Sequence, residues 1–479
     1  MALFFNTSEF FLFFSVVYLL YLCLSHRWQN YLLLAASYIF YGSWDWRFLS
    51  LIWLSTGIDY VIGLKIDQAK TPRRRKILLW VSMGSSLLIL GFFKYFNFFN
   101  DSLVELVSVF GWQVEGFTLH VILPVGISFY TFQTMSYTID IYRRQLKPAR
   151  KLTDFALFVA FFPQLVAGPI ERATSLLPQV MRPRRLSDQK VFEGMYLIGW
   201  GLFKKVIVAD SLATLVEPVF AGGPYNGPQV WLALYAFAWQ IYGDFSGYTD
   251  IARGLAKLMG FELMLNFNLP YFSRNAREFW QRWHISLSTW LKDYLYIPLG
   301  GNRHGWGKTQ RNLMITMLLG GLWHGAAWTF VVWGGYQGLL LIVHRAMERF
   351  WPQAWGETLN RYRVWQVGKM IIFFHLAAIG WLFFRARSMG QAGEMLLAMF
   401  SSWEIKTGFS DKVLYFSLVI AIVLLTQVMQ WRRRDLLFWL KLPRINQMVY
   451  GAAVLFVALY VFMSENAPVM GREFIYFQF

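Results

Sequence analysis

The sequence has 479 residues, of which 56% are hydrophobic, 19% aromatic and only 15% charged, and its mean hydropathy is +0.39. A soluble chain of this length would carry about 25% charged residues, so the composition excludes a soluble globular domain. The formal net charge of +18 suggests nucleic-acid binding at first sight, but the placement of the basic residues argues against it.

Apolar segments recur along the chain, each approaching the length of about 20 helical residues that a hydrocarbon core requires. The clearest are 10–24, 48–64, 77–93, 370–384, 413–429 and 448–463. These segments do not alternate polar and apolar residues as the strands of a membrane barrel do, and only helices otherwise satisfy a backbone within lipid. The sequence therefore predicts an all-α, polytopic integral membrane protein with about eleven transmembrane helices plus re-entrant or interfacial helices.

Short loops between these segments contain most of the basic residues. The densest clusters lie at 65–76, 143–151, 182–185 and 432–434. Basic residues confined to short loops are typical of the cytosolic side of a membrane protein, and no partner role for nucleic acid is predicted. Because Arg27 follows the first span, we expect the N-terminus outside the cytosol. The same rule puts residues 464–479 outside, as an aromatic tail after a single transmembrane domain over 1–463.

An ionisable residue deep in a membrane is costly and often functional, which makes His324 the strongest candidate. No charged residue lies between Asn312 and Gln337. At about 1.5 Å per residue, His324 is about 18 Å from Asn312, near the middle of a core about 30 Å thick. The structural alternative is a histidine that bonds a neighbouring helix across the small face formed by Gly321 and Gly325.

Residues 278–294 predict an amphipathic helix along the membrane interface, with tryptophans on one face and charged residues on the other. His284 is at the edge of the apolar face, either as a functional residue or as part of an aromatic belt. Upstream, Asp244, Ser246 and Asp250 lie between apolar stretches. A cap at the start of a helix, or an ion pair of Asp250 with Arg253, is their structural alternative.

Two further segments have a functional and a structural interpretation. The glycine-rich loop 298–311 contains Arg303, Lys308 and Arg311, which either bind the phosphates of a cytosolic donor or only mark the cytosolic side. The apolar ending 474–479 predicts insertion into the protein or the interface, as an anchor or with Tyr476 as a nucleophile. A phenol with a pKa of about 10 is only about 0.1% ionised at pH 7 and would need a base. The histidines do not form an H-x-x-x-H zinc pair.

These motifs resemble the membrane-bound O-acyltransferase family, in particular its alginate O-acetylation branch. The resemblance extends over roughly residues 1–400 and is carried by 8–14, 123–129, 168–170, 244–250, 279–290, 296–302 and 319–324. It implies helices around a central funnel, His324 as the catalytic histidine, His284 as the second recurrent one, and a thioester donor on the cytosolic side. The tail 474–479 is similar to the C-terminal motif of a small partner protein in teichoic-acid D-alanylation, whose tyrosine is a proposed acyl relay.

The sequence thus predicts an O-acyltransferase of the bacterial inner membrane that moves an acetyl group from acetyl-CoA toward an exported polysaccharide such as alginate or cellulose. We expect His324 to act as general base, with His284 and Tyr476 also catalytic and no metal involved. The predicted substrate-binding residues are Asp244, Ser246, Asp250, Arg303, Lys308, Arg311 and Trp323. Expected partners are membrane lipid, an extracytoplasmic SGNH-hydrolase-like acetyltransferase and a polysaccharide secretion complex. The competing hypothesis is a non-catalytic transporter or scaffold subunit, which would tolerate the loss of His324.

Overall fold

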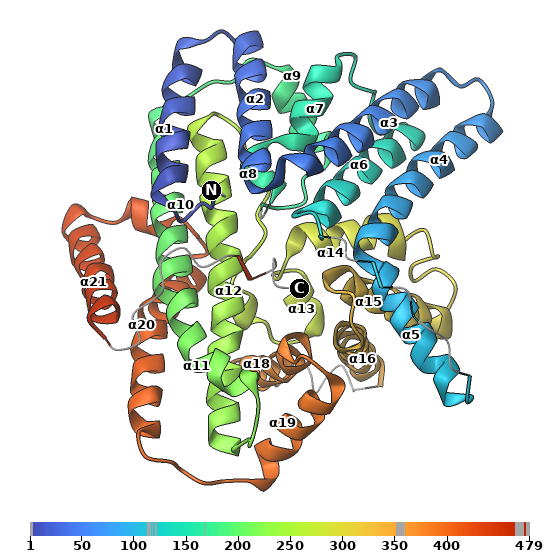
Figure 1. Ribbon diagram of the computed structural model, residues 1–479. Helices are drawn as coiled ribbons and strands as arrows, with labels where there is room; N and C mark the ends of the chain where they lie inside the picture. Colours follow the sequence, from blue (N-terminus) through green and yellow to red (C-terminus); the bar gives the residue numbers. More distant parts are fainter. Residues whose placement is uncertain are drawn as a thin grey trace. The chain divides into compact units, whose positions relative to one another are not determined.

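The computed structural model describes residues 3–112, 116, 118–119, 122–166, 168–350, 359, 361–464 and 474–475. All regular elements in these ranges are helical, which confirms the all-α prediction. Figure 1 shows their arrangement along the chain. The principal helices are α1 Ser8–Cys23, α2 His26–Asp45, α3 Leu49–Gln68, α4 Pro72–Leu90, α5 Phe96–Val109, α6 Ile127–Tyr142, α7 Leu152–Ala160, α8 Phe162–Leu165, α9 Ala173–Met181, α10 Asp188–Leu202, α11 Asp210–Ala221, α12 Gly227–Leu258, α13 Ala276–Trp280, α14 Ile285–Leu291, α15 Trp306–His324, α16 Trp328–Phe350, α18 Arg363–Arg385, α19 Met389–Ser401, α20 Phe409–Arg433 and α21 Arg444–Met463.

Five helical segments among the described residues are long and apolar enough to cross a membrane. They are His26–Gln68, Pro72–Val109, Arg363–Arg385, Phe409–Arg433 and Arg444–Met463, and the first two each contain two helices joined end to end. They contain the predicted spans from 48–64 onward, while 10–24 corresponds to the shorter α1. Length and hydropathy leave out helices such as α12, which has acidic residues in its middle, so these criteria do not test the predicted number of eleven.

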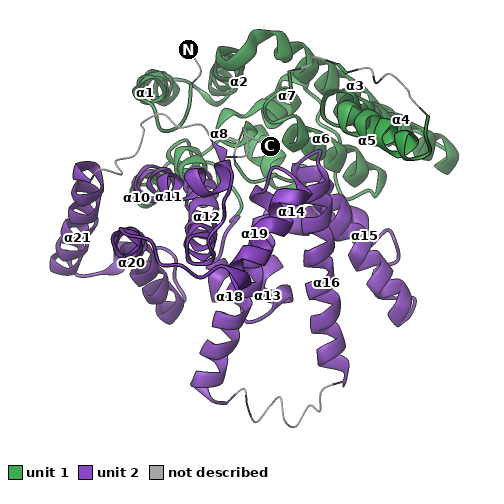
Figure 2. Cartoon of the chain, turned by 60° about the horizontal axis from the view of Figure 1, so that its bottom comes forward, with its two compact units in different colours: residues 1–198, 251–264 green, residues 199–250, 265–479 purple. Residues whose placement is uncertain are grey.

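The chain divides into two compact units, drawn in two colours in Figure 2. Unit 1 consists of residues 1–198 and 251–264, and unit 2 of 199–250 and 265–479. In unit 1, α3, α4 and α6 pack together around buried polar groups: the Ser82 hydroxyl lies 2.6 Å from Asp59 Oδ1 and 2.9 Å from Thr138 Oγ1. Such interhelical hydrogen bonds are common in membrane proteins, where helix association gains little from the hydrophobic effect.

In unit 2, α15 and α16 form a closely packed hairpin. A Cβ atom on Gly321 would lie 2.2 Å from the carbonyl oxygen of Phe330, and one on Gly334 would lie 2.3 Å from that of Met317. Only glycine permits this approach of the two backbones. The hairpin fixes the end of α15, where His324 is the last helical residue.

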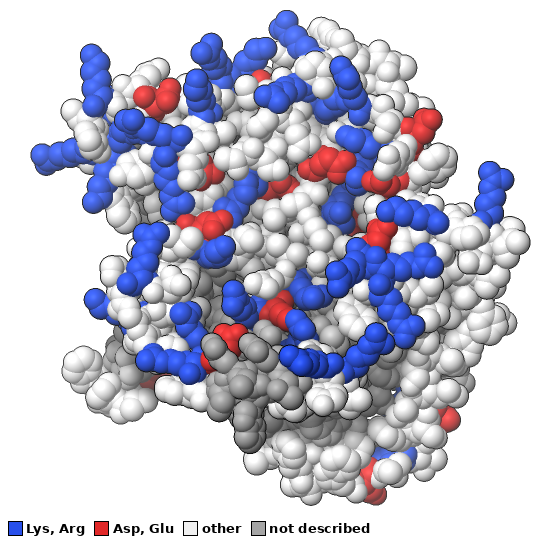
Figure 3. Space-filling model, turned by 180° about the vertical axis from the view of Figure 1, so that it is seen from behind, with Lys and Arg blue, Asp and Glu red and all other residues white. Residues whose placement is uncertain are grey.

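Lysine and arginine side chains dominate the charged groups on the face that Figure 3 presents. The surface also exposes many large apolar side chains, for example Leu88, Val109, Leu397, Phe456 and Met463. Exposed apolar residues at this density are expected where the surrounding solvent is lipid.

Candidate active site

His324 is held at the buried end of α15 by aromatic rings. His324 is only 4% exposed. The centroid of its ring lies 5.0 Å from the ring centroid of Trp323, 5.1 Å from that of Trp333 and 5.4 Å from that of Phe384. The helix ends there because Gly325 is extended, with φ −157°, and a Cβ atom at Gly325 would lie 2.1 Å from the Phe330 ring. The local sequence therefore fixes the imidazole in an apolar, tightly packed environment.

The prediction of one uninterrupted helix over 278–294 is wrong. The first helix, α13, ends at Trp280, and the second, α14, begins at Ile285. Between them His284 takes a left-handed backbone conformation with φ +45°. The break is stabilised by the preceding segment, because Asn268 N donates to the Arg282 carbonyl and Ile285 N donates to the Asn266 carbonyl, each at 2.9 Å. His284 consequently points into the protein core and is fully buried rather than lying in an interfacial belt.

Asn266 is a hydrogen-bond partner of His284. Asn266 Oδ1 accepts from the backbone N–H of Ser286 at 3.1 Å and from the Ser286 hydroxyl at 2.9 Å, so this atom is the amide oxygen. His284 Nδ1 lies 3.2 Å from the same oxygen and 3.3 Å from the Ser286 hydroxyl. The contact with the amide oxygen favours the tautomer protonated at Nδ1, in which Nε2, buried and without a hydrogen-bond partner among the described residues, carries the lone pair.

His284 and His324 face the same small region of unit 2. Their ring centroids lie 6.1 Å apart, and the ring of Trp323 lies 5.9 Å from that of His284. Burial lowers the pKa of His284, which lies between two short helices outside the membrane-spanning ones, to about 3. His284 is therefore neutral at physiological pH, as a proton acceptor must be before it acts.

The predicted residues Asp244, Ser246 and Asp250 lie within the long helix α12, so they do not cap a helix. Two lysines of the adjoining π-helical segment Phe203–Ala209 bind them. Lys205 Nζ lies 2.7 Å from Asp244 and 2.8 Å from Asp210, with all three side chains under 5% exposed. The second lysine, Lys204, donates to Asp250 at 2.7 Å and to Ser246 at 2.9 Å.

Glycines allow the α12 helix to approach the π-helical segment closely enough for these buried ion pairs. A Cβ atom on Gly243 would lie 2.9 Å from the Lys204 carbonyl oxygen, and one on Gly247 would lie 2.7 Å from that of Gly201. A buried charge must be paired, and the close approach brings each lysine within reach of its carboxylate. The polar cluster is thus built into the packing of unit 2.

The two described residues of the C-terminal tail dock on this cluster. The backbone N–H of Ile475 donates to Asp244 Oδ2 at 2.8 Å, and both Phe474 and Ile475 are buried. The ring of Phe474 lies 5.4 Å from Phe245, whose own ring is 4.7 Å from His284. Phe474 and Ile475 are thus inserted into the protein, as expected for the apolar ending, whereas Tyr476 itself lies outside the described residues.

The predicted donor loop is not brought to the histidines as a group. Arg303 lines a cavity of about 1030 Å³ beside α13, α14 and α16. Lys308 is exposed, and Arg311 donates to the adjacent Asn312 side chain at 3.0 Å. Trp323, by contrast, is buried against both histidines, with its ring centroid 5.9 Å from that of His284 and 5.0 Å from that of His324.

Sequence reasoning missed Asn266, Lys204 and Lys205. The two lysines were detectable as a charged pair inside the apolar run that follows residue 195. Asn266 offered no signal, because its role depends on pairing with a segment 18 residues away. Among the described residues, no group of three or more histidine, cysteine, aspartate or glutamate side chains is placed to hold a metal ion.

Comparisons with known proteins found a matching family model and several similar proteins. The model of the membrane-bound O-acyltransferase family matches residues 146–384, which include both histidines. The chain is 44% identical over 428 residues to the probable alginate O-acetylase AlgI of Azotobacter vinelandii, covering 88% of this chain and 83% of that protein. It is 46% identical over 407 residues to the corresponding protein of Pseudomonas aeruginosa, covering 84% and 76%. It is 36% identical over 433 residues to the peptidoglycan O-acetyltransferase of Helicobacter pylori, covering 83% and 80%.

Proposed function

Because the chain belongs to the membrane-bound O-acyltransferase family and is a multi-pass membrane O-acyltransferase, we propose that it moves an acetyl group from cytosolic acetyl-CoA to an exported polysaccharide. The names of the relatives support acetyl as the transferred group, since two are alginate O-acetylases and one is a peptidoglycan O-acetyltransferase. The two alginate O-acetylases share 44% and 46% identity with this chain, more than the 36% of the peptidoglycan O-acetyltransferase, which favours alginate as the polymer.

The observation that carries the proposal is the buried pair of His284 and His324, with ring centroids 6.1 Å apart. His324 takes the proton of an acceptor hydroxyl as that oxygen attacks the thioester carbonyl. The carbon–sulfur bond then breaks, and the sulfur of coenzyme A leaves and recovers the proton. General-base catalysis of this kind contributes about 10²–10⁴-fold to a rate.

His284 supports this step through the tautomer that Asn266 favours. With Nδ1–H bonded to Asn266, Nε2 accepts a hydrogen bond from the acceptor hydroxyl or from the protonated partner histidine. A second imidazole held neutral beside the base lets the site carry a proton without a buried carboxylate. Trp323 and the surrounding rings exclude water, which would otherwise hydrolyse the thioester.

The tail supplies the proposed acceptor within the protein. Asp244 anchors the backbone of Ile475, and Tyr476 is the next residue in the chain. In this scheme the Tyr476 phenol oxygen takes the acetyl group from coenzyme A as an ester. On the extracytoplasmic side a hydroxyl of an SGNH-hydrolase-like partner of the secretion complex attacks the ester carbonyl, and the phenol leaves and takes up the proton. The partner then passes the acetyl group from its own ester to a hydroxyl of the polysaccharide.

The scheme requires a definite membrane orientation. We place the protein in the bacterial inner membrane with both termini outside the cytosol, and residues 464–479 as the tail of a single transmembrane domain. The basic loops 65–76 and 432–434 support this orientation, because such clusters remain on the cytosolic side.

The function is tested in cells that lack the native protein and express the wild type, His324→Ala or Tyr476→Phe. We expect polysaccharide acetylation only with the wild type, and an acetyl group on the tail peptide of the wild type by mass spectrometry. His375→Ala is the control, because His375 bonds its own helix at the Ile371 carbonyl oxygen and should be dispensable. Normal acetylation with His324→Ala would contradict the catalytic proposal and favour a transporter or scaffold. Normal acetylation with Tyr476→Phe would contradict only the relay.

A further inference from the structure

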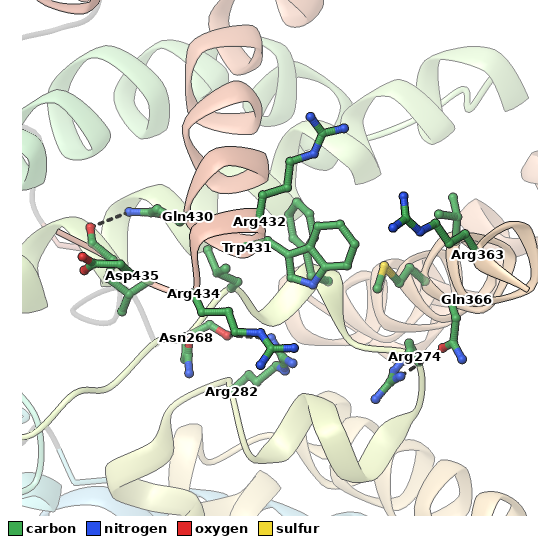
Figure 4. Close-up of a pocket in the computed structure, with 15 residues that line it drawn as sticks. Asn268, Arg274, Arg282, Arg363, Gln366, Gln430, Trp431, Arg432, Arg434 and Asp435 are labelled. Atoms are coloured by element: carbon green, nitrogen blue, oxygen red, sulfur yellow. Dashed lines mark hydrogen bonds between the residues drawn. The ribbon is translucent and has the colours of Figure 1, made fainter. Parts of the chain in front are cut away.

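A large cavity with arginine-rich walls lies in unit 2. It has a volume of about 1240 Å³ and lies among the segment 268–282, the start of α18 and the end of α20 (Figure 4). Among the residues that the structure describes, five arginines line it and only one carboxylate does. The arginines are Arg274, Arg282, Arg363, Arg432 and Arg434, and we call this cavity the arginine pocket.

The positive charge of the arginine pocket is only partly neutralised by the protein. Arg274 is paired with Glu278 and donates to Gln366 at 3.0 Å. The lining carboxylate, Asp435, is bound to Lys441 at 2.6 Å. Within the described part of the chain, Arg363 and Arg434 have no carboxylate partner. The pocket therefore has cationic groups available for an anionic ligand.

The wall of the arginine pocket is continuous with the histidine site. Arg282 and Asn268 line the pocket and are joined by the hydrogen bond from Asn268 N to the Arg282 carbonyl. Two residues away along each segment, Asn266 and His284 form the histidine site. The same two hydrogen-bonded segments therefore contribute to both the pocket wall and the surroundings of His284.

The pocket also offers an aromatic surface. Trp431 is 41% exposed, lines the cavity, and has its ring centroid 6.0 Å from that of Phe272. In Figure 4 its indole lies beside Arg432 and Arg434, with Arg274 and Gln366 to the right of it. Guanidinium groups bind phosphate through parallel N–H bonds, and an indole stacks on a nucleobase. A nucleotide diphosphate has both of these features.

We propose that the arginine pocket binds the phosphate groups of the thioester donor, with the adenine against Trp431. The inference rests on the proposed function and replaces the loop 298–311 as the principal phosphate site. Anionic phospholipid headgroups share the phosphate chemistry, so the test must separate the two sources. The test must also distinguish the effect of the pocket arginines from that of other basic residues on the cytosolic side.

The test uses the full-length protein in detergent, with binding of coenzyme A and steady-state turnover as readouts. The variants are Arg363→Gln, Arg434→Gln and the double variant. Arg433→Gln is the matched control, because Arg433 is on the same helix end but lies against Phe438 and does not line the cavity. S-acetylpantetheine, which has the thioester but no phosphate, is the matched substrate.

We expect each pocket variant to raise the Kd of coenzyme A and the KM of acetyl-CoA about tenfold, equivalent to about 1.4 kcal/mol of binding free energy. The KM of S-acetylpantetheine should be unchanged, and Arg433→Gln should behave as the wild type. Arg434→Lys, which keeps the charge, should recover part of the affinity. Thermal unfolding in detergent checks that each variant is folded.

An equal effect of Arg433→Gln, or an unchanged Kd in the double variant, would overturn the inference. The inference would also be overturned if the double variant lost bound anionic phospholipid, measured by native mass spectrometry, but bound coenzyme A as the wild type does. His324→Ala should bind coenzyme A normally. If that variant turns over donor at the wild-type rate, the proposed catalytic function fails while the binding measurements still report on the pocket.

Discussion

The Nδ1 atom of His284 lies 3.2 Å from the side-chain oxygen of Asn266, and this contact favours the tautomer with the proton on Nδ1. Because the same oxygen accepts the backbone N–H of Ser286, it cannot be exchanged for the amide nitrogen. In that tautomer a neutral imidazole presents its Nε2 lone pair beside His324. We therefore propose that Asn266 positions His284 for the chemistry proposed at the two histidines.

Replacing Asn266 with alanine should lower kcat about 10- to 100-fold, part of the about 10²–10⁴-fold that general-base catalysis supplies. The KM of acetyl-CoA should remain within about twofold, since the arginine pocket is intact. Asn266→Asp keeps the acceptor and should recover much of the rate. Ser288→Ala is the control, because the Ser288 hydroxyl donates to the Trp283 carbonyl and not to the His284 ring, and the backbone bond from Ser288 N to the His284 carbonyl is kept in the variant. Equal kcat values for Asn266→Ala and Ser288→Ala would refute the role of Asn266.

The low pKa of His284 predicts how stability depends on pH. Its pKa is about 3 in the folded protein against about 6.5 in the unfolded chain. As the pH falls below about 6.5, the unfolded state binds a proton that the folded state does not, so stability decreases. The thermal unfolding temperature of the wild type should therefore fall more between pH 7.5 and pH 5 than that of His284→Gln. The control is the exposed His304→Gln, which should follow the wild type. A parallel fall in His284→Gln would show that His284 does not contribute.

Features that depend on the residues of one segment could be predicted from the sequence, whereas features that depend on contacts between distant segments could not. Hydropathy located the helices, because the preference of a segment for lipid depends on its own residues. The burial of His324 agrees with the apolar run around it, and the burial of Phe474 and Ile475 agrees with the apolar composition of the tail. The break at His284 was not predictable, because the periodicity over 278–294 is helical and the bonds that interrupt it come from Asn266 and Asn268. The partners of Asp244 were missed for the same reason, since they come from a different helix.

Lys205 should be essential for the stability of unit 2. Replacing Lys205 with methionine leaves the carboxylates of Asp210 and Asp244 buried without its charge, and breaking a buried pair in this way costs about 3–5 kcal/mol. We expect a large loss of folded protein in detergent, measured by size exclusion and thermal unfolding. Adding Asp244→Asn should restore part of the stability. The exposed Lys406→Met is the control, and stability equal to that control would show that the cluster is dispensable.

The anchor of the tail depends on one backbone N–H. Replacing Ile475 with proline removes the donor to Asp244, whereas Ile475→Val retains it. We expect Ile475→Pro to lose polysaccharide acetylation while its thermal unfolding temperature remains close to that of the wild type. Ile475→Val should retain both. Full acetylation by Ile475→Pro would show that the contact with Asp244 does not position the tail.

The central claim is that the buried imidazole of His324 acts as the base in acetyl transfer. The most direct measurement is the rate of thioester loss from acetyl-CoA by purified wild type, His324→Ala and the control His375→Ala, at saturating donor. The account predicts a fall of about 10²–10⁴-fold in kcat for His324→Ala, with coenzyme A binding unchanged and His375→Ala as active as the wild type. A folded His324→Ala protein that turns over acetyl-CoA at the wild-type rate would contradict it.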